Sequence, residues 1–194
     1  EIVQFLSDPG SFQPRNVGNG TVLGVELEFR KSLKFISSSL EKFQWNTNLT
    51  ITESQISMSA TERRSRQLTA REGQEIGTTR DMAGQAPYII NTGIAYSDFN
   101  TGWEAGIYYN VQGPTLNMVG FGNRTDTYAV PFNSLNLNIN KTFGADERIR
   151  ASFGVQNLLN DKREFIFSSY GAQDQFFTQL APGVRANFSL GFSF

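Results

Sequence analysis

The segment 183–194 (GVRANFSLGFSF) constrains the fold of this chain more than any other. Apolar residues occupy every second position from Val184 to Phe194, with polar or small residues between them. Successive side chains of an extended strand point to opposite faces, so such a strand has one apolar face and one polar face. The segment therefore predicts a long β-strand that separates an apolar environment from a wet one.

The same alternation recurs along the 194 residues, which predicts an all-β antiparallel fold of about eight strands. In one strand the apolar phase shifts by one residue between Phe132 and Leu135, which predicts a bulge or a strand start near Ser134. The seven further strands are expected at 1–6, 21–31, 43–53, 88–96, 103–111, 130–142 and 149–155.

The connections between the predicted strands alternate between short and long. A meander with short turns at one end and long loops at the other is the layout of bacterial outer-membrane barrels. The arginine-rich stretch 62–81 is interpreted as part of a solvated loop, with local helix and a role in binding a ligand or partner as alternatives. The serine-rich segment 32–42 is interpreted as a turn, with one short amphipathic turn of helix as the alternative. The short connections are 32–42, 97–102 and 144–147, and the long ones are 7–20, 54–85, 113–128 and 159–182.

The distribution of apolar residues excludes a transmembrane helix but not a transmembrane barrel. No run of consecutive apolar residues is longer than three, whereas a spanning helix needs about 20. A barrel strand places lipid-facing residues at every second position, and an eleven-residue strand tilted by about 40° rises roughly 28 Å, close to the apolar band of about 25 Å. The chain is therefore expected to be a multi-pass protein of the bacterial outer membrane, in contact with its lipid.

Aromatic residues cluster beside the short turns, where a girdle at the membrane interface is expected. A second girdle at the opposite end is expected from Tyr88, Tyr109 and Phe132. The girdle beside the short turns is assigned to Phe43, Trp45, Tyr96, Trp103, Phe143, Phe192 and Phe194.

The polar positions of the strands predict a wet interior that carries charge. Alternation alone does not say which face is inside, so a soluble lipocalin-like binder with an apolar interior is an alternative; the girdles and the one-sided loops favour the apolar face outside. The charged side chains either contact a plug or a solute, or pair with one another. These candidates are Glu26, Glu28, Arg30, Glu104, Arg150 and Arg185.

Several chemistries have little support in the sequence. The net charge of −1 argues against a nucleic-acid partner. The sequence has no histidine and no cysteine, which removes the commonest general base and the common soft metal ligands. We therefore expect no enzymatic activity, no catalytic residues, no metal site and no cofactor.

Two internal motifs and the terminal residue resemble the TonB-dependent receptors of the outer membrane. Residues 24–28 read GVELE as a loop enters a strand, and residues 153–162 read FGVQNLLNDK where that family usually reads GVNNLFDK. Phe194 completes the ordered set. Residues 109–116 (YNVQGPTL) and the asparagine-rich strand before Phe143 resemble the Bacteroidetes type of this family.

The resemblance implies that residues 1–194 are the C-terminal part of a 22-stranded barrel with a plugged lumen. The signal peptide, the plug domain and the upstream strands would then lie outside this sequence. It implies a receptor that takes up a scarce nutrient (a glycan, a peptide, an iron chelate or similar) powered by TonB through the plug, or a barrel scaffold in an outer-membrane complex.

Two partner proteins are implied as well. The barrel-assembly machinery would read the last strand, with Phe188, Phe192 and Phe194 as its signal, and a surface lipoprotein would accompany the receptor. The alternative to a receptor fragment is a complete eight-stranded barrel with a structural or adhesive role, in which the first strand pairs with the last.

Overall fold

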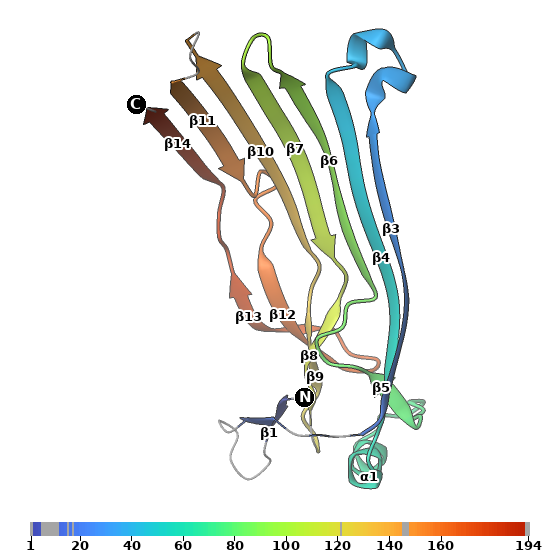
Figure 1. Ribbon diagram of the computed structural model, residues 1–194. Helices are drawn as coiled ribbons and strands as arrows, with labels where there is room; N and C mark the ends of the chain where they lie inside the picture. The colour runs from blue at the N-terminus through green and yellow to red at the C-terminus, as the bar shows by residue number, and fades with distance from the viewer. Residues whose placement is uncertain are drawn as a thin grey trace.

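Seven long antiparallel strands form a single curved wall in the computed structural model, which describes residues 2–4, 12–14, 16, 18–120, 122–144 and 148–192 (Figure 1). The strand order is β14-β11-β10-β7-β6-β4-β3, so almost every wall strand pairs with the wall strand that follows it in sequence. The predicted meander is confirmed. The wall consists of β3 (Gly20–Ser32), β4 (Phe43–Ser57), β6 (Tyr88–Asp98), β7 (Trp103–Gln112), β10 (Phe132–Phe143), β11 (Ile149–Gln156) and β14 (Arg185–Phe192).

The strand register keeps like residues on like faces across the whole wall. Leu49 of β4 lies opposite Leu27 on one side and Ile90 on the other, whereas Asn48 lies opposite Glu28 and Asn91. The apolar face is exposed, with Leu23 at 73% and Phe188 at 70%. An exposed apolar face across seven strands suits contact with lipid and not with water, since soluble proteins rarely expose so large a patch.

The connections separate by length at the two ends of the wall, as predicted. The turn end carries the connections β3–β4, β6–β7 and β10–β11, and the loop end carries the long ones (Figure 1). The turn between β3 and β4 contains two short 3₁₀ helices, η1 (Leu33–Phe35) and η2 (Ser38–Leu40), so the segment is closer to the helical alternative than to a plain turn.

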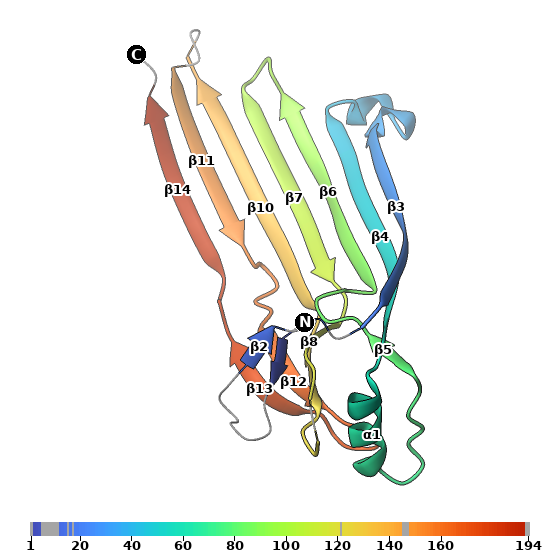
Figure 2. The same cartoon turned by 60° about the horizontal axis from the view of Figure 1, so that its bottom comes forward.

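The long connections contain regular secondary structure, of which only a local helix within 54–85 is among the predicted alternatives. Four short strands form a second sheet at the loop end, which we call the loop-end sheet, in the order β13-β12-β9-β8. The remaining long connection contains a helix and a strand, β5, that pairs with the loop end of β4 (Figure 2). These elements are α1 (Ala60–Leu68), β5 (Thr79–Asp81), β8 (Thr115–Met118), β9 (Asp126–Ala129), β12 (Arg163–Ser168) and β13 (Gln175–Leu180).

The prediction that the first segment joins the wall is wrong. Its described part, β1 (Ile2–Gln4), pairs with β2 (Phe12–Pro14) in a separate two-stranded sheet. Three residues are too few to cross the apolar band. Pairing with a segment close in sequence closes only a short loop and therefore costs little conformational entropy. The wall therefore has seven long strands among the described residues.

The wall is open in the part of the chain that the structure describes. β3 and β14 are its two edges and do not pair with each other, so the strands do not close into the small barrel considered as an alternative. An unpaired edge strand presents a row of backbone donors and acceptors that require a partner strand in a membrane.

The phase shift near Ser134 marks a strand start, one of the two predicted outcomes, and not a bulge, because β10 begins at Phe132. The register between β10 and β7 runs unbroken from Phe132 opposite Gln112 to Lys141 opposite Trp103. Phe132 therefore lies on the polar face with Ser134, so its assignment to the second girdle is wrong. The aromatic ring finds a partner there, because the Arg163 guanidinium carbon lies 4.6 Å from the ring centroid.

Candidate functional site

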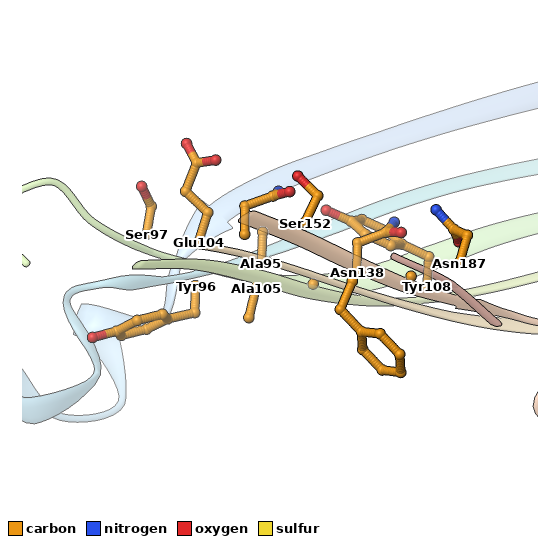
Figure 3. Close-up of a pocket in the computed structure, with 13 residues that line it drawn as sticks. Ala95, Tyr96, Ser97, Glu104, Ala105, Tyr108, Asn138, Ser152 and Asn187 are labelled. Carbon is orange, nitrogen blue, oxygen red and sulfur yellow. The ribbon is translucent and has the colours of Figure 1, made fainter. Parts of the chain in front are cut away.

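The polar face of the wall gathers the charged residues that the sequence singled out. Figure 3 shows Ser97, Glu104 and Ser152 on one side of the sheet. The side chains of Tyr96 and Ala105 point to the other side. The register places all six predicted charged residues on the polar face, with the pairs Glu26–Thr50, Glu28–Asn48, Arg30–Asn46, Glu104–Asn140, Arg150–Thr142 and Arg185–Gln156.

Only two of these six charges pair with each other among the described residues. Arg150 Nη2 donates to Glu104 Oε2 at 2.7 Å, which links β11 to β7 across β10. Both side chains are about half exposed, so the pair itself contributes little stability. The other four, Glu26, Glu28, Arg30 and Arg185, have no ion pair within the described residues and are available to a ligand.

Asparagine amides cover the centre of the polar face. Asn110 Nδ2 donates to Asn91 Oδ1 at 2.7 Å. The side-chain oxygens of Asn46 and Asn48 are buried and accept no hydrogen bond within the described residues. Because amides both donate and accept, such a surface suits hydroxyl-rich or amide-rich solutes and water. The alternation predicts that this face is polar, but no asparagine is among the predicted site residues.

Tyr108 is a further residue of this face that sequence reasoning missed. Its ring lies over Gly93 and Gly106: a Cβ atom on Gly93 would be 2.4 Å from Tyr108 Cδ1, and one on Gly106 would be 2.5 Å from its Oη. Only glycine leaves room for an aromatic ring against the sheet. The sequence carries a signal for this arrangement, because Gly106 and Tyr108 occupy successive polar positions of β7 and Gly93 is the partner of Tyr108 on β6. The alternation pattern instead selects the neighbouring Tyr109, which lies on the apolar face.

Two adjoining recesses are hollowed in the polar face. The smaller has a volume of about 480 Å³ and includes Glu104, Asn140 and Asn187 (Figure 3). The larger has a volume of about 620 Å³ and lies nearer the loop end, between Phe132 and Arg185. Tyr108 and Asn138 line both recesses. Their sizes lie in the usual range of small-molecule sites.

The family-like motif at 153–162 forms a turn that closes the loop end of β11. The buried Asn157 adopts a positive φ of 54° and donates from Nδ2 to the carbonyl oxygens of Asp161 (3.1 Å) and Gly183 (3.0 Å). The Asp161 carboxylate accepts from the backbone and the side-chain nitrogens of Asn133 at 2.7 and 2.9 Å. This turn therefore ties together the ends of β10, β11 and β14.

The predicted girdle residues within the described range lie on the apolar face at the turn end. Phe43 packs on Tyr96 with ring centroids 5.0 Å apart. Lys141 Nζ lies 5.5 Å from the Trp103 ring and 5.2 Å from the Phe143 ring. Trp45 contacts Phe29 at 5.0 Å, and Phe192 pairs with Ile149 at the end of β14. Phe194 lies outside the described residues.

The stretch predicted as a solvated loop holds a buried ion network. Arg66 donates to both carboxylate oxygens of Asp126 at 3.0 and 2.9 Å, and so joins α1 to β9. Glu62 accepts from Arg66 at 3.3 Å and from Arg80 at 2.6 Å, and the Arg80 side chain is only 8% exposed. The solvated-loop interpretation is wrong for these arginines, because carboxylates distant in sequence neutralise them.

Within the described ranges no group of three or more His, Cys, Asp or Glu side chains is placed to hold a metal ion. No helix in those ranges is long and apolar enough to cross a membrane.

A family model for the TonB-dependent receptor-like β-barrel matches residues 1–158 of the 194. The chain belongs to the TonB-dependent receptor β-barrel family. The matched range includes the GVELE step and the first part of the 153–162 motif, and ends before β12. Comparisons with curated proteins and with solved structures gave no significant match. Family membership assigns the chain to outer-membrane receptors and transporters that engage TonB through a plug.

Proposed function

We propose that this chain forms part of the barrel wall of an outer-membrane receptor that imports a scarce nutrient, such as a glycan, a peptide or an iron chelate. The observation that carries the proposal is the division of the wall into two continuous faces, one exposed and apolar, the other polar and recessed. A barrel with this division holds an aqueous lumen within lipid.

The side chains of the polar face would bind and guide the solute or contact the plug. Glu26, Glu28, Arg30 and Arg185 have no ion pair within the described residues, so these charges can be neutralised by a plug or solute. The Glu104–Arg150 pair is already neutralised and links β7 to β11 on the lumen face. The TonB-dependent receptor family is a family of transporters, which supports a polar face that binds a solute without converting it.

The remaining parts of the proposal concern the larger assembly. Upstream strands of a 22-stranded barrel would pair with the free edges of β3 and β14, which are open in the described wall. TonB would act through an upstream plug, and a surface lipoprotein would accompany a receptor of the Bacteroidetes type. A scaffold role within an outer-membrane complex is the alternative outcome of the test below.

The test compares nutrient uptake by the source bacterium with and without the gene. Cells limited for one nutrient at a time are supplied with labelled glycans, peptides or ferric chelates. We expect the deletion to abolish uptake of one class, and deletion of TonB to abolish the same uptake. Normal uptake of every class together with loss of a co-purifying complex would establish the scaffold role and overturn transport.

A further inference from the structure

The larger recess of the polar face concentrates positive charge with no opposing acid. Two arginines line it, Arg163 from the start of β12 and Arg185 from the start of β14. No aspartate or glutamate contributes to its lining. Two exposed arginines in one recess without a carboxylate favour an anionic ligand, because guanidinium groups bind carboxylates and phosphates with two parallel hydrogen bonds.

Both guanidinium groups lack a carboxylate partner within the described residues. Arg163 lies over the Phe132 ring, which orders its side chain without neutralising its charge. The nearest acids in sequence are engaged elsewhere. Glu164 accepts from Gln179, and Asp161 accepts from Asn133 and from the Lys162 backbone.

One buried side chain fixes the positions of both arginines. Asn157 Nδ2 donates to the carbonyls of Asp161 and Gly183, and each of these residues lies two positions before one of the arginines. Asn157 Oδ1 also accepts from the Asp161 backbone at 3.0 Å. The turn formed by the family-like motif therefore holds β12 and β14 so that Arg163 and Arg185 lie at one recess.

The recess also offers neutral groups for the rest of a ligand. Tyr108, Asn138 and Gln156 line it, and their polar side-chain groups make no hydrogen bond within the described part of the chain. The Phe132 ring adds an apolar surface beside Arg163. A volume of about 620 Å³ accommodates a ligand larger than a simple ion.

We propose that this recess binds the carboxylate or phosphate group of an anionic solute, with Arg163 and Arg185 as the binding groups and Asn157 as a positioning residue. The proposal rests on the proposed receptor function and names the class of solute. It adds a specificity to the polar face, which would favour an acidic molecule over its neutral counterpart.

Matched probes test this charge preference on the full-length receptor purified in detergent. Glucuronate and glucose 6-phosphate are compared with glucose by saturation-transfer NMR, which detects weak ligands and reports whether a carboxylate or a phosphate is preferred. We expect binding of at least one acidic probe, no comparable binding of glucose, and weaker binding at higher ionic strength. Equal binding of glucose and both acidic probes, or no binding of either acid, would overturn the proposal.

Variants then locate the site. R163Q/R185Q should weaken binding of the acidic probe by about tenfold or more, since it removes two charge-assisted contacts. R163K/R185K keeps the charge but loses the bidentate geometry and should fall between that double variant and the wild type. R63Q/R64Q removes two exposed arginines of α1, outside the recess, and should bind as the wild type does.

Binding to the purified receptor needs neither TonB nor transport. The purified receptor could show charge-selective binding that is lost in R163Q/R185Q while deletion of the gene leaves uptake unchanged. That result would support the anion site at the recess and overturn the transport function. Uptake that depends on the gene, without charge-selective binding, would support the transport function and overturn the anion site. Binding of the acidic probe that R163Q/R185Q leaves unchanged would place the anion elsewhere and overturn the assignment.

Discussion

At the residue scale, a few positions decide how the polar face is shaped. Gly93 gives the Tyr108 ring room to lie against the sheet, and Asn157 holds a left-handed turn with its side-chain hydrogen bonds. Neither role follows from alternation, because period two says which face a residue occupies and nothing about its contacts. Alternation was enough to place the charged candidates on that face. It fails for Phe132, an aromatic residue that lies on the polar face because of its contact with Arg163, which is distant in sequence.

Replacement of Gly93 by alanine should destabilise the barrel by about 1–3 kcal/mol, because the new methyl group would meet Tyr108 Cδ1 at 2.4 Å and the Ile107 carbonyl oxygen at 2.8 Å. Thermal unfolding of the purified receptor, followed by circular dichroism, measures the change. Gly191→Ala is the matched control on the same face, since its Cβ would approach nothing closer than 3.9 Å. Equal melting temperatures of the two variants would contradict the assigned packing.

Protonation of Asp161 should loosen the turn after β11 at low pH. Burial raises the pKa of this carboxyl, but hydrogen bonds donated by Asn133 and by the Lys162 backbone outweigh burial and hold the pKa below its usual range. A depressed pKa in the folded state means that the contribution to stability is complete above the unfolded pKa of about 3.9 and is lost as the pH falls through the folded value.

The Asp161→Asn variant isolates this contribution. Between pH 6 and pH 2 the free energy of unfolding should decrease less in this variant than in the wild type. At pH 6 the variant should be the less stable of the two proteins. Titrations in detergent with a chemical denaturant give both curves, and every other carboxyl titrates in both proteins and cancels in the difference. A wild-type minus variant difference that does not change with pH would refute the role of Asp161.

At the element scale, the sequence predicts the wall far better than the loop end. Strands of eight to fifteen residues carry enough alternating positions to be recognised, and six of the seven further segments join β14 in the wall. The strands of the loop-end sheet have only four to six residues, and the central pairing of β9 with β12 spans a large sequence separation, as between Tyr128 and Ile166. Local periodicity carries no information about such pairing.

The helix α1 should depend on Arg66 for its attachment to β9. Arg66→Ala would leave Asp126 partly buried without its bidentate partner, and loss of one member of a buried pair is strongly destabilising. We expect faster hydrogen exchange across residues 58–70, measured by mass spectrometry, with the wall unchanged. Arg63→Ala, at an exposed position on the same helix, should exchange like the wild type. Unchanged exchange in Arg66→Ala would show that other contacts hold α1.

At the scale of the whole molecule, the asymmetry of the wall predicts its orientation in the membrane. The sequence has no cysteine, so a single introduced cysteine in it can be labelled specifically. Gln173→Cys, in the β12–β13 connection at the loop end, should react with a membrane-impermeant maleimide on intact cells. Asn100→Cys, in the tight turn between β6 and β7, should react only after the outer membrane is permeabilised. The wild type gives the background, and the reverse pattern would invert the orientation.

Assembly of the whole barrel should depend on β14. β14 carries Phe188 and Phe192 on its apolar face at the edge of the wall, and the family resemblance implies that the barrel-assembly machinery reads this strand through Phe194. Deletion of Phe194 should lower the amount of receptor in the outer membrane more than removal of residues 171–174, a tip of the loop end, because an unrecognised chain fails before its strands pair. Quantitative immunoblots of outer-membrane fractions give both levels. Phe194→Tyr keeps an aromatic ring at position 194 and should assemble nearly as well as the wild type. A normal level of the deletion variant would show that recognition lies elsewhere in the chain.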